Sequence, residues 1–185
     1  MPMPKHRSEK DAPAPWQVPV ALEDVGESGR LVDLAADADT RAAVARTAGL
    51  RDLPRLQAHF AVNRHGGGGL HVTGHVSATV GQTCVVTLEA LTNEVEEDVD
   101  LLFVPQPAAG GNGGEVDAGN ENWGEAEPLV GGRIDLGLLA TEFLILGLDP
   151  YPRKSDAEFQ PPADVSDDDG PFAALAALKK ARDGP

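Results

Sequence analysis

Three histidines are the first residues in this sequence whose type and spacing could bind a metal. His59, His71 and His75 fall on the polar positions of two neighbouring runs in which polar and apolar residues alternate. Because side chains alternate faces along a strand, all three should lie on one polar face of a sheet. Two or three imidazoles can bind zinc, but no carboxylate stands at a ligand-like position nearby in the sequence. We therefore expect surface histidines, with no metal site and no cofactor.

A single cysteine, Cys84, is the one candidate nucleophile of its kind. It shares the apolar parity of Ala78 and Val80, which predicts a buried small side chain. A reactive thiol needs a basic, partly exposed setting, and the immediate neighbours include no basic residue. One cysteine also forms no intramolecular disulfide and no cysteine-rich zinc site. We expect Cys84 to be structural.

Carboxylates dominate the polar positions of a third alternating run. Glu94, Glu96, Asp98 and Asp100 follow one another on the same predicted face, with no basic residue among them. Two interpretations stay open: a solvated face that discourages strand aggregation, or a docking face for a basic partner. Acid–base catalysis is disfavoured because no histidine or lysine lies within sequence reach of these carboxylates.

Glu142 is the only charged residue inside a predicted apolar helix. We expect it either to pair with an arginine such as Arg133 or to be partly exposed. No residue is predicted to be catalytic, so we expect a protein that is not an enzyme.

The elements that position these residues are three consecutive strands within residues 53–104. Directly opposed residues share a face, so the paired residue numbers of the first hairpin must add to an even number, either 134 or 136. The first sum places His59 opposite His75, and the second places it opposite Ser77. A loop of four glycines imposes neither register.

Flanking segments complete an α+β fold. Short strands are predicted at 16–22 and 30–34, and another near residues 128–130. Between them, Asp37 or Asp39 can cap a helix that runs to about residue 48. Asp135 is expected to cap a helix that runs to about Leu148, and the apolar residues of this helix cover nearly its whole circumference, which is typical of a buried helix. We predict a curved antiparallel sheet covered by this helix, and leave open whether the sheet closes toward a barrel.

The expected organisation is one domain with unstructured flanks. Residues 1–15 read as a disordered lead, 16–150 as a single α+β domain, 106–127 as a flexible acidic Gly-rich insert, and 151–170 as a linker. Residues 171–182 are predicted to form a short amphipathic helix that docks on a partner through Phe172, Leu175, Leu178 and Lys179. The alternative is that this helix packs back on its own domain.

The net charge of −15 limits the partners. No lysine occurs between Lys10 and Lys154, so the body should repel phosphate and contact RNA only indirectly or locally. A basic protein is the favoured partner. No apolar run is long enough to span a membrane, and we expect a cytoplasmic protein of undetermined oligomeric state.

Five separated motifs resemble the YceD family of large ribosomal RNA subunit accumulation proteins, in an alphaproteobacterial form. They are residues 72–89, including Gln82, Thr83, Cys84 and Leu88; residues 99–105; residues 133–137, including Asp135; residues 148–153, including Asp149, Pro150, Tyr151, Pro152 and Arg153; and residues 172–179. The resemblance implies a factor that supports accumulation of large-subunit ribosomal RNA, with no assigned catalytic residue. Many members have a second cysteine three residues after the first with an arginine between. Thr87 and Val86 stand at those positions here, which argues against zinc.

The resulting hypothesis is a non-enzymatic factor for large-subunit ribosome assembly that binds a ribosomal protein, an assembly protein or an RNA–protein intermediate. Two alternatives stay open. One is an acidic chaperone for a single basic ribosomal protein. The other is a small-molecule-binding or hydrolytic domain that uses the pocket between sheet and helix.

Overall fold

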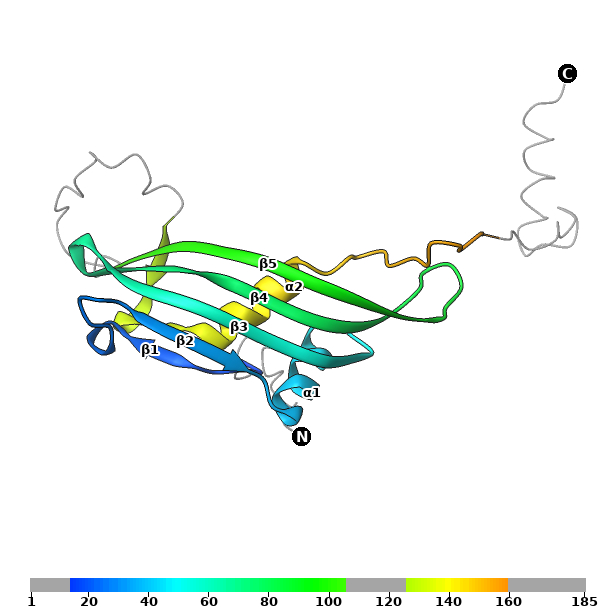
Figure 1. Ribbon diagram of the computed structural model, residues 1–185, viewed down its shortest axis with the longest axis horizontal. Coiled ribbons are helices and arrows are strands. Elements are labelled where there is room, and N and C mark those ends of the chain that lie inside the picture. The colour runs from blue at the N-terminus through cyan, green and yellow to red at the C-terminus, as the bar shows by residue number, and fades with distance from the viewer. Residues whose placement is uncertain (1–13, 106–125, 160–185) are drawn as a thin grey trace, which may run out of the picture.

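A computed structural model describes residues 14–105 and 126–159 of the chain (Figure 1). Its centre is a five-stranded sheet with strand order β2-β3-β4-β5-β6. The strands of this sheet are β2 (Arg30–Ala35), β3 (Asp52–His65), β4 (Gly69–Thr83), β5 (Ala90–Pro105) and β6 (Glu127–Leu129). Neighbouring strands from β2 to β5 are antiparallel, whereas β6 pairs with β5 in parallel. The three long strands expected within residues 53–104 are confirmed.

The first hairpin adopts the register whose residue numbers add to 134. Phe60 lies opposite Gly74, and His59 lies opposite His75. The strands are joined by residues 66–68, in which Gly67 and Gly68 adopt positive φ angles of 76° and 82°. That backbone conformation favours glycine, which explains the glycine run at this point.

One face of the sheet carries the hydrophobic core. The alternating apolar residues of β3 and β4, including Leu56, Phe60, Val72 and Val76, are buried. Helix α2 (Leu136–Leu146) lies across this face, behind the long strands in Figure 1, and buries Leu136, Leu139, Ala140 and Leu144. The predicted α+β architecture, a curved sheet covered by an apolar helix, is therefore confirmed.

Closure into a barrel does not occur in the described part of the chain. Strands β2 and β6 form the two edges of the sheet: β2 pairs only with β3, and β6 pairs only with β5. Because β6 pairs with only the last three residues of β5, most of the outer edge of β5 has no neighbouring strand among the described residues. The sheet thus stays open.

The N-terminal segment differs from the edge strand expected at residues 16–22. Strand β1 (Pro19–Ala21) is shorter and pairs antiparallel with β7 (Arg133–Asp135) in a separate two-stranded sheet. Trp16, just before it, is buried in the core. The expected strand at 30–34 is confirmed as β2, and the expected helix is confirmed as α1 (Ala38–Thr47). In the first turn of α1, the backbone N–H of Thr40 donates a hydrogen bond to the Asp37 carboxylate at 2.8 Å.

Candidate functional site

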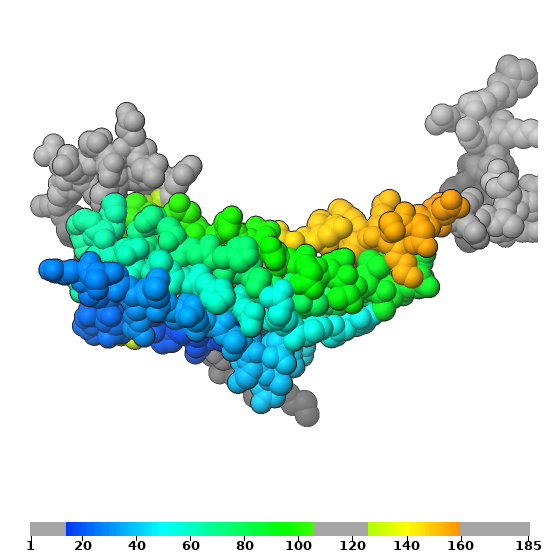
Figure 2. Space-filling model, viewed as in Figure 1, coloured from blue at the N-terminus to red at the C-terminus, as the bar shows by residue number. Residues whose placement is uncertain are grey.

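Two motifs that lie far apart in the sequence meet at one end of the sheet. The first is the turn of residues 84–89 between β4 and β5, and the second is the segment of residues 149–154 that follows α2. In Figure 2 the surface of the second segment, in orange, lies along the green surface of that end of the sheet. We call the paired segments the clamp. Residues 151–154, assigned to the linker from the sequence, are thus attached to the body.

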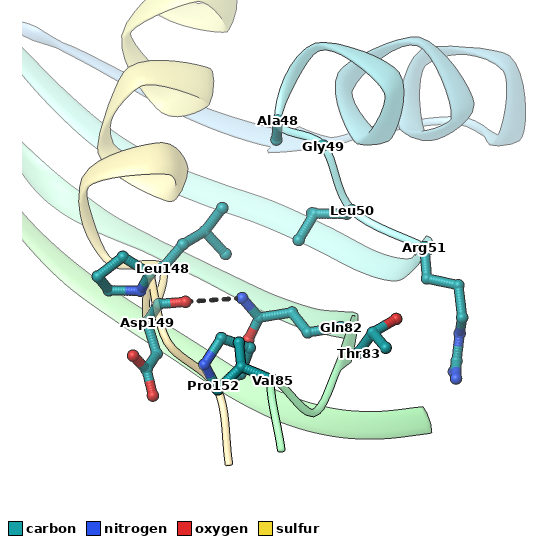
Figure 3. Close-up of a pocket in the computed structure, with 11 residues that line it drawn as sticks. Ala48, Gly49, Leu50, Arg51, Gln82, Thr83, Val85, Leu148, Asp149 and Pro152 are labelled. Atoms are coloured by element: carbon teal, nitrogen blue, oxygen red, sulfur yellow. Dashed lines mark hydrogen bonds between the residues drawn. The ribbon is translucent and has the colours of Figure 1, made fainter. Parts of the chain in front are cut away.

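Hydrogen bonds hold the clamp together. The Gln82 Nε2 amide donates to the Asp149 carbonyl at 2.9 Å, as the dashed line in Figure 3 marks, while the Gln82 Oε1 accepts from Asn93 at 2.9 Å. The Val85 N–H donates to the carbonyl of Pro152, which is buried, also at 2.9 Å. Both ends of the Gln82 side chain are therefore used for structure. This explains the presence of a glutamine, because it can donate and accept simultaneously.

The thiol of Cys84 is fully buried under this turn, as expected. Its sulfur accepts a hydrogen bond from the Thr87 N–H at 3.4 Å. The Thr87 hydroxyl, the Thr87 N–H and then the backbone N–H of Lys154 lower the pKa of the thiol to about 7. The expectation that no basic residue adjoins Cys84 is wrong, since the clamp brings Lys154 close in space from 70 positions away in sequence.

An ion pair closes the outer side of the turn. The Lys154 ammonium contacts the Glu89 carboxylate at 2.5 Å. The hydrogen bond from Lys154 lowers the pKa of Glu89, with a smaller contribution from Thr87. Glu89 is exposed and Lys154 is partly exposed, so we expect this pair to fix geometry more than it adds stability. Leu88 adopts a positive φ of 60° within the same turn, and its side chain is 78% exposed.

A hollow of about 540 Å³ lies between the clamp and the end of α1 (Figure 3). Its walls come from residues 48–51, from Gln82, Thr83 and Val85, and from Leu148, Asp149, Pro150 and Pro152. In Figure 3 Leu50 and Leu148 point toward one another, whereas the Arg51 side chain points away. No histidine or second carboxylate joins Asp149 in this lining. The hollow therefore offers shape and apolar surface more than acid–base chemistry.

The outer surface of the clamp combines apolar, aromatic and basic side chains. Tyr151 is 70% exposed, and Val85, Leu88 and Arg153 are also exposed. Aromatic residues and arginine are the types that contribute most to protein interfaces. The described geometry thus gathers nine of the ten motif residues named from the sequence, and the hydrogen bonds of Gln82 hold the two segments together. Leu88, Tyr151 and Arg153 face solvent.

Asp135 lies away from the clamp, at the start of α2. Its carboxylate accepts hydrogen bonds from the N–H groups of Gly137 at 3.0 Å, Leu138 at 3.1 Å and Val18 at 2.8 Å. The side chain therefore caps the helix, as predicted, and also ties the N-terminal segment to it.

Strand β5 carries the predicted row of carboxylates on its exposed face. Glu94, Glu96, Asp98 and Asp100 are all exposed on the face opposite the core. Glu94 is paired with Arg55 at 2.8 Å and also accepts from Thr79, interactions that lower the pKa of Glu94 in that order. Whether this face docks a partner stays a prediction.

The histidines have carboxylate neighbours that the sequence analysis missed. Asp33, His59, His75 and Asp98 form one row across β2, β3, β4 and β5. His59 contacts Asp33 at 2.7 Å and His75 contacts Asp98 at 2.9 Å, while His71 contacts Asp100 at 2.7 Å. The expectation that no carboxylate adjoins them is wrong because strand pairing, not sequence distance, supplies it. Even so, within residues 14–105 and 126–159 no three potential metal-ligating side chains gather.

The remaining predicted contact residues, Phe172, Leu175, Leu178 and Lys179, lie outside the described residues. Within the described part of the chain, no helix has the length and apolar character required to cross a membrane.

Comparison with known proteins identifies the family of this chain. No curated protein and no solved structure matches the chain. A family model described as large ribosomal RNA subunit accumulation protein YceD matches residues 72–179, from β4 through the clamp and beyond the described region. Because this match spans more than half of the 185 residues, the chain belongs to the YceD family of large ribosomal RNA subunit accumulation proteins.

Proposed function

We propose that this protein supports the accumulation of large-subunit ribosomal RNA without catalysis, by binding a protein or RNA–protein partner through the outer surface of the clamp. The family name supports the role in ribosomal RNA accumulation. The observation that carries the binding mechanism is that two segments of the family motifs, 67 positions apart, are hydrogen-bonded to one another and leave Tyr151, Leu88 and Arg153 exposed. A rigid frame with exposed aromatic and basic side chains is suited to recognition.

The charge of the chain favours a basic partner. With a net charge of −15, the field of the protein attracts a basic ribosomal or assembly protein and repels free RNA. RNA would then be reached through such a protein, or locally through Arg153. We also propose a cytoplasmic location, since the family name ties the protein to ribosome formation.

Replacement of the exposed clamp residues tests this proposal. The double variant Tyr151→Ala/Arg153→Ala removes side chains that are solvent-exposed, so its melting temperature should stay within about 2 °C of the wild type. In cells that lack the endogenous copy, the variant should fail to restore the ratio of large- to small-subunit ribosomal RNA. Leu31→Ala is the matched control, because Leu31 is 83% exposed on a different surface. Full restoration by the folded double variant would refute the clamp as the binding surface.

The acidic face of β5 supports a second candidate, a chaperone for one basic ribosomal protein. Glu96 and Asp98 are exposed there beside further carboxylates. The substitution Glu96→Lys/Asp98→Lys should weaken capture of such a partner from lysate, with and without nuclease, if this face binds it. Unchanged capture by a folded variant would exclude this candidate. The small-molecule or hydrolytic alternative gains no support, because none of the described histidines and cysteines lines the pocket between α2 and the sheet.

A further inference from the structure

A second, more apolar groove runs along α2. It has a volume of about 500 Å³ and lies between α2, the end of β5 and β6. Its apolar lining includes Leu101, Phe103, Val130, Leu138, Phe143 and Leu146. Val130 is 66% exposed and Leu146 is 75% exposed. Contact of several large apolar side chains with water is unfavourable, so such a groove is typical of a docking site.

The origin of the groove is the composition of α2. This helix is apolar around its circumference, but the sheet covers only the side that carries Leu136, Leu139, Ala140 and Leu144. Leu138 and Leu146 lie on the uncovered side. A helix with two apolar sides needs two neighbours, and the described residues supply one.

Two carboxylates mark the groove as a site for a cation. Glu142 of α2 and Glu127 of β6 both line it, together with Arg133. The pKa of Glu142 is raised, first by desolvation and then by the nearby charge of Glu127. Neither glutamate takes part in an ion pair with a described residue. Of the two expectations for Glu142, the arginine partner is therefore wrong among the described residues, and the exposed position is confirmed. An occupant should therefore combine apolar side chains with a positive charge.

We infer that this groove binds residues 171–182 of the same chain, with Phe172, Leu175 and Leu178 on its apolar lining. In a helical conformation these three residues recur at every third position and share one side. Lys179, Lys180 and Arg182 follow directly, so the same segment supplies the positive charge for Glu142 and Glu127.

Other segments of the chain fit the groove less well. Residues 106–125 contain no lysine or arginine and several acids, so Glu142 and Glu127 would repel them. Residues 1–13 carry basic residues but offer only two methionines as large apolar side chains. Residues 171–182 alone among these combine both requirements.

The length of the connecting chain limits how far residues 171–182 can lie from Phe159. Eleven residues separate Phe159, the last described position, from Pro171. An extended chain covers roughly 3.3 Å per residue, or about 40 Å across this interval. The 11 residues of α2 extend only about 16 Å at 1.5 Å per residue. If the segment runs antiparallel to α2, Phe172 lies near Leu146 and Lys179 comes within side-chain reach of Glu142.

This occupancy has a consequence for partner binding. The residues predicted to dock on a partner are the same ones that fill the groove, so the two interactions exclude each other. A partner that takes the helix must displace it from the groove, and α2 then exposes Leu146 and Val130. The groove would thus lower the apparent affinity for the partner by the fraction of chains in which the segment is docked.

Carbodiimide cross-linking of the purified full-length chain tests the inference without any partner. This reagent joins a carboxylate to an ammonium group that touches it. Mass spectrometry should find Lys179 or Lys180 joined to Glu142 or Glu127. The pair of Lys154 and Glu89, in contact at 2.5 Å, is the internal positive control. A mixture of isotopically light and heavy protein shows whether each link forms within one copy.

Two matched variants sharpen the result. Leu146→Asp places a charge in the groove and should lower the yield of the Glu142 link about tenfold or more, because it removes the burial of one leucine side chain. Leu31→Asp, on a different and equally exposed surface, should leave the yield unchanged. Three outcomes overturn the inference. They are no link to Glu142 or Glu127 while Lys154 still links to Glu89, about half of the links joining a light to a heavy copy in an equal mixture, or equal losses in both variants.

Discussion

The triple hydrogen bond to Asp135 leads to a quantitative prediction about stability. Replacement of Asp135 by alanine leaves the N–H groups of Val18, Gly137 and Leu138 without their acceptor. Loss of the helix cap costs about 1 kcal/mol. The bond from Val18 to a charged acceptor, which is partly buried, contributes roughly 2 kcal/mol more. The free energy of unfolding should therefore fall by about 3 kcal/mol.

Asp37 provides the matched comparison within the same chain. It caps α1 through one backbone donor, Thr40, at 2.8 Å, and within residues 14–105 and 126–159 it makes no bond to a distant segment. Asp37→Ala should therefore cost only about 1 kcal/mol. Asp135→Asn retains a carbonyl oxygen that can accept the same bonds, and asparagine is a good capping residue, so its cost should also be about 1 kcal/mol or less.

Urea denaturation followed by circular dichroism measures these differences. With a slope near 2 kcal/mol per molar urea, Asp135→Ala should lower the midpoint by about 1.5 M, and Asp37→Ala by about 0.5 M. Equal shifts for the two alanine variants would show that the bond from Val18 contributes nothing. A loss for Asp135→Asn as large as that for Asp135→Ala would mean that charge, not hydrogen bonding, matters at this position.

Three further predictions concern the sheet, the thiol and RNA. Gly74→Ala should cost about 1–3 kcal/mol in urea unfolding, because its Cβ would lie 2.2 Å from the His59 carbonyl, whereas Gly26→Ala, with no atom within 4 Å, should be neutral; equal effects would refute this packing argument. The pKa of Cys84, about 7 when folded against an ordinary 9.0, predicts that ionisation of the thiol adds stability that is full above pH 9 and is lost as the pH falls through 7. The difference in urea midpoint from Cys84→Ala should therefore shrink over this range, and a pH-independent difference would contradict the argument. Large-subunit RNA fragments should bind the purified chain more weakly than about 1 μM in gel shifts, and tighter, salt-sensitive binding would refute the electrostatic argument.

Strand periodicity predicted the sheet well but could not choose its register. Alternation fixed which residues face the core, and parity reduced the hairpin to two registers. The observed register packs the Phe60 ring over Gly74, where a Cβ would lie 2.6 Å from the Phe60 Cδ1. A glycine inside a strand of β-branched residues was therefore the available signal, because such a glycine marks close packing by a neighbour.

Contacts between distant segments were beyond the reach of the sequence. Lys154 reaches Cys84 and Glu89, and Asp33 reaches His59, only because strand order and the path of the chain after α2 bring them together. No local pattern encodes these distances. Capping, in contrast, is local, and Asp37 and Asp135 could be predicted from the residues next to them.

The pairing of β1 with β7 has a consequence for synthesis of the protein on the ribosome. Val20 is nearly fully buried, yet its strand partner Ile134 follows 114 residues later. At about 5–20 residues per second, translation of this interval takes roughly 6–23 s. During that time the nascent chain can form the hairpins of β2–β5, but their apolar side stays open until α2 emerges. The fold is therefore completed late in translation. A pause before residue 146 lengthens the time during which the incompletely folded chain exposes apolar surface and can aggregate.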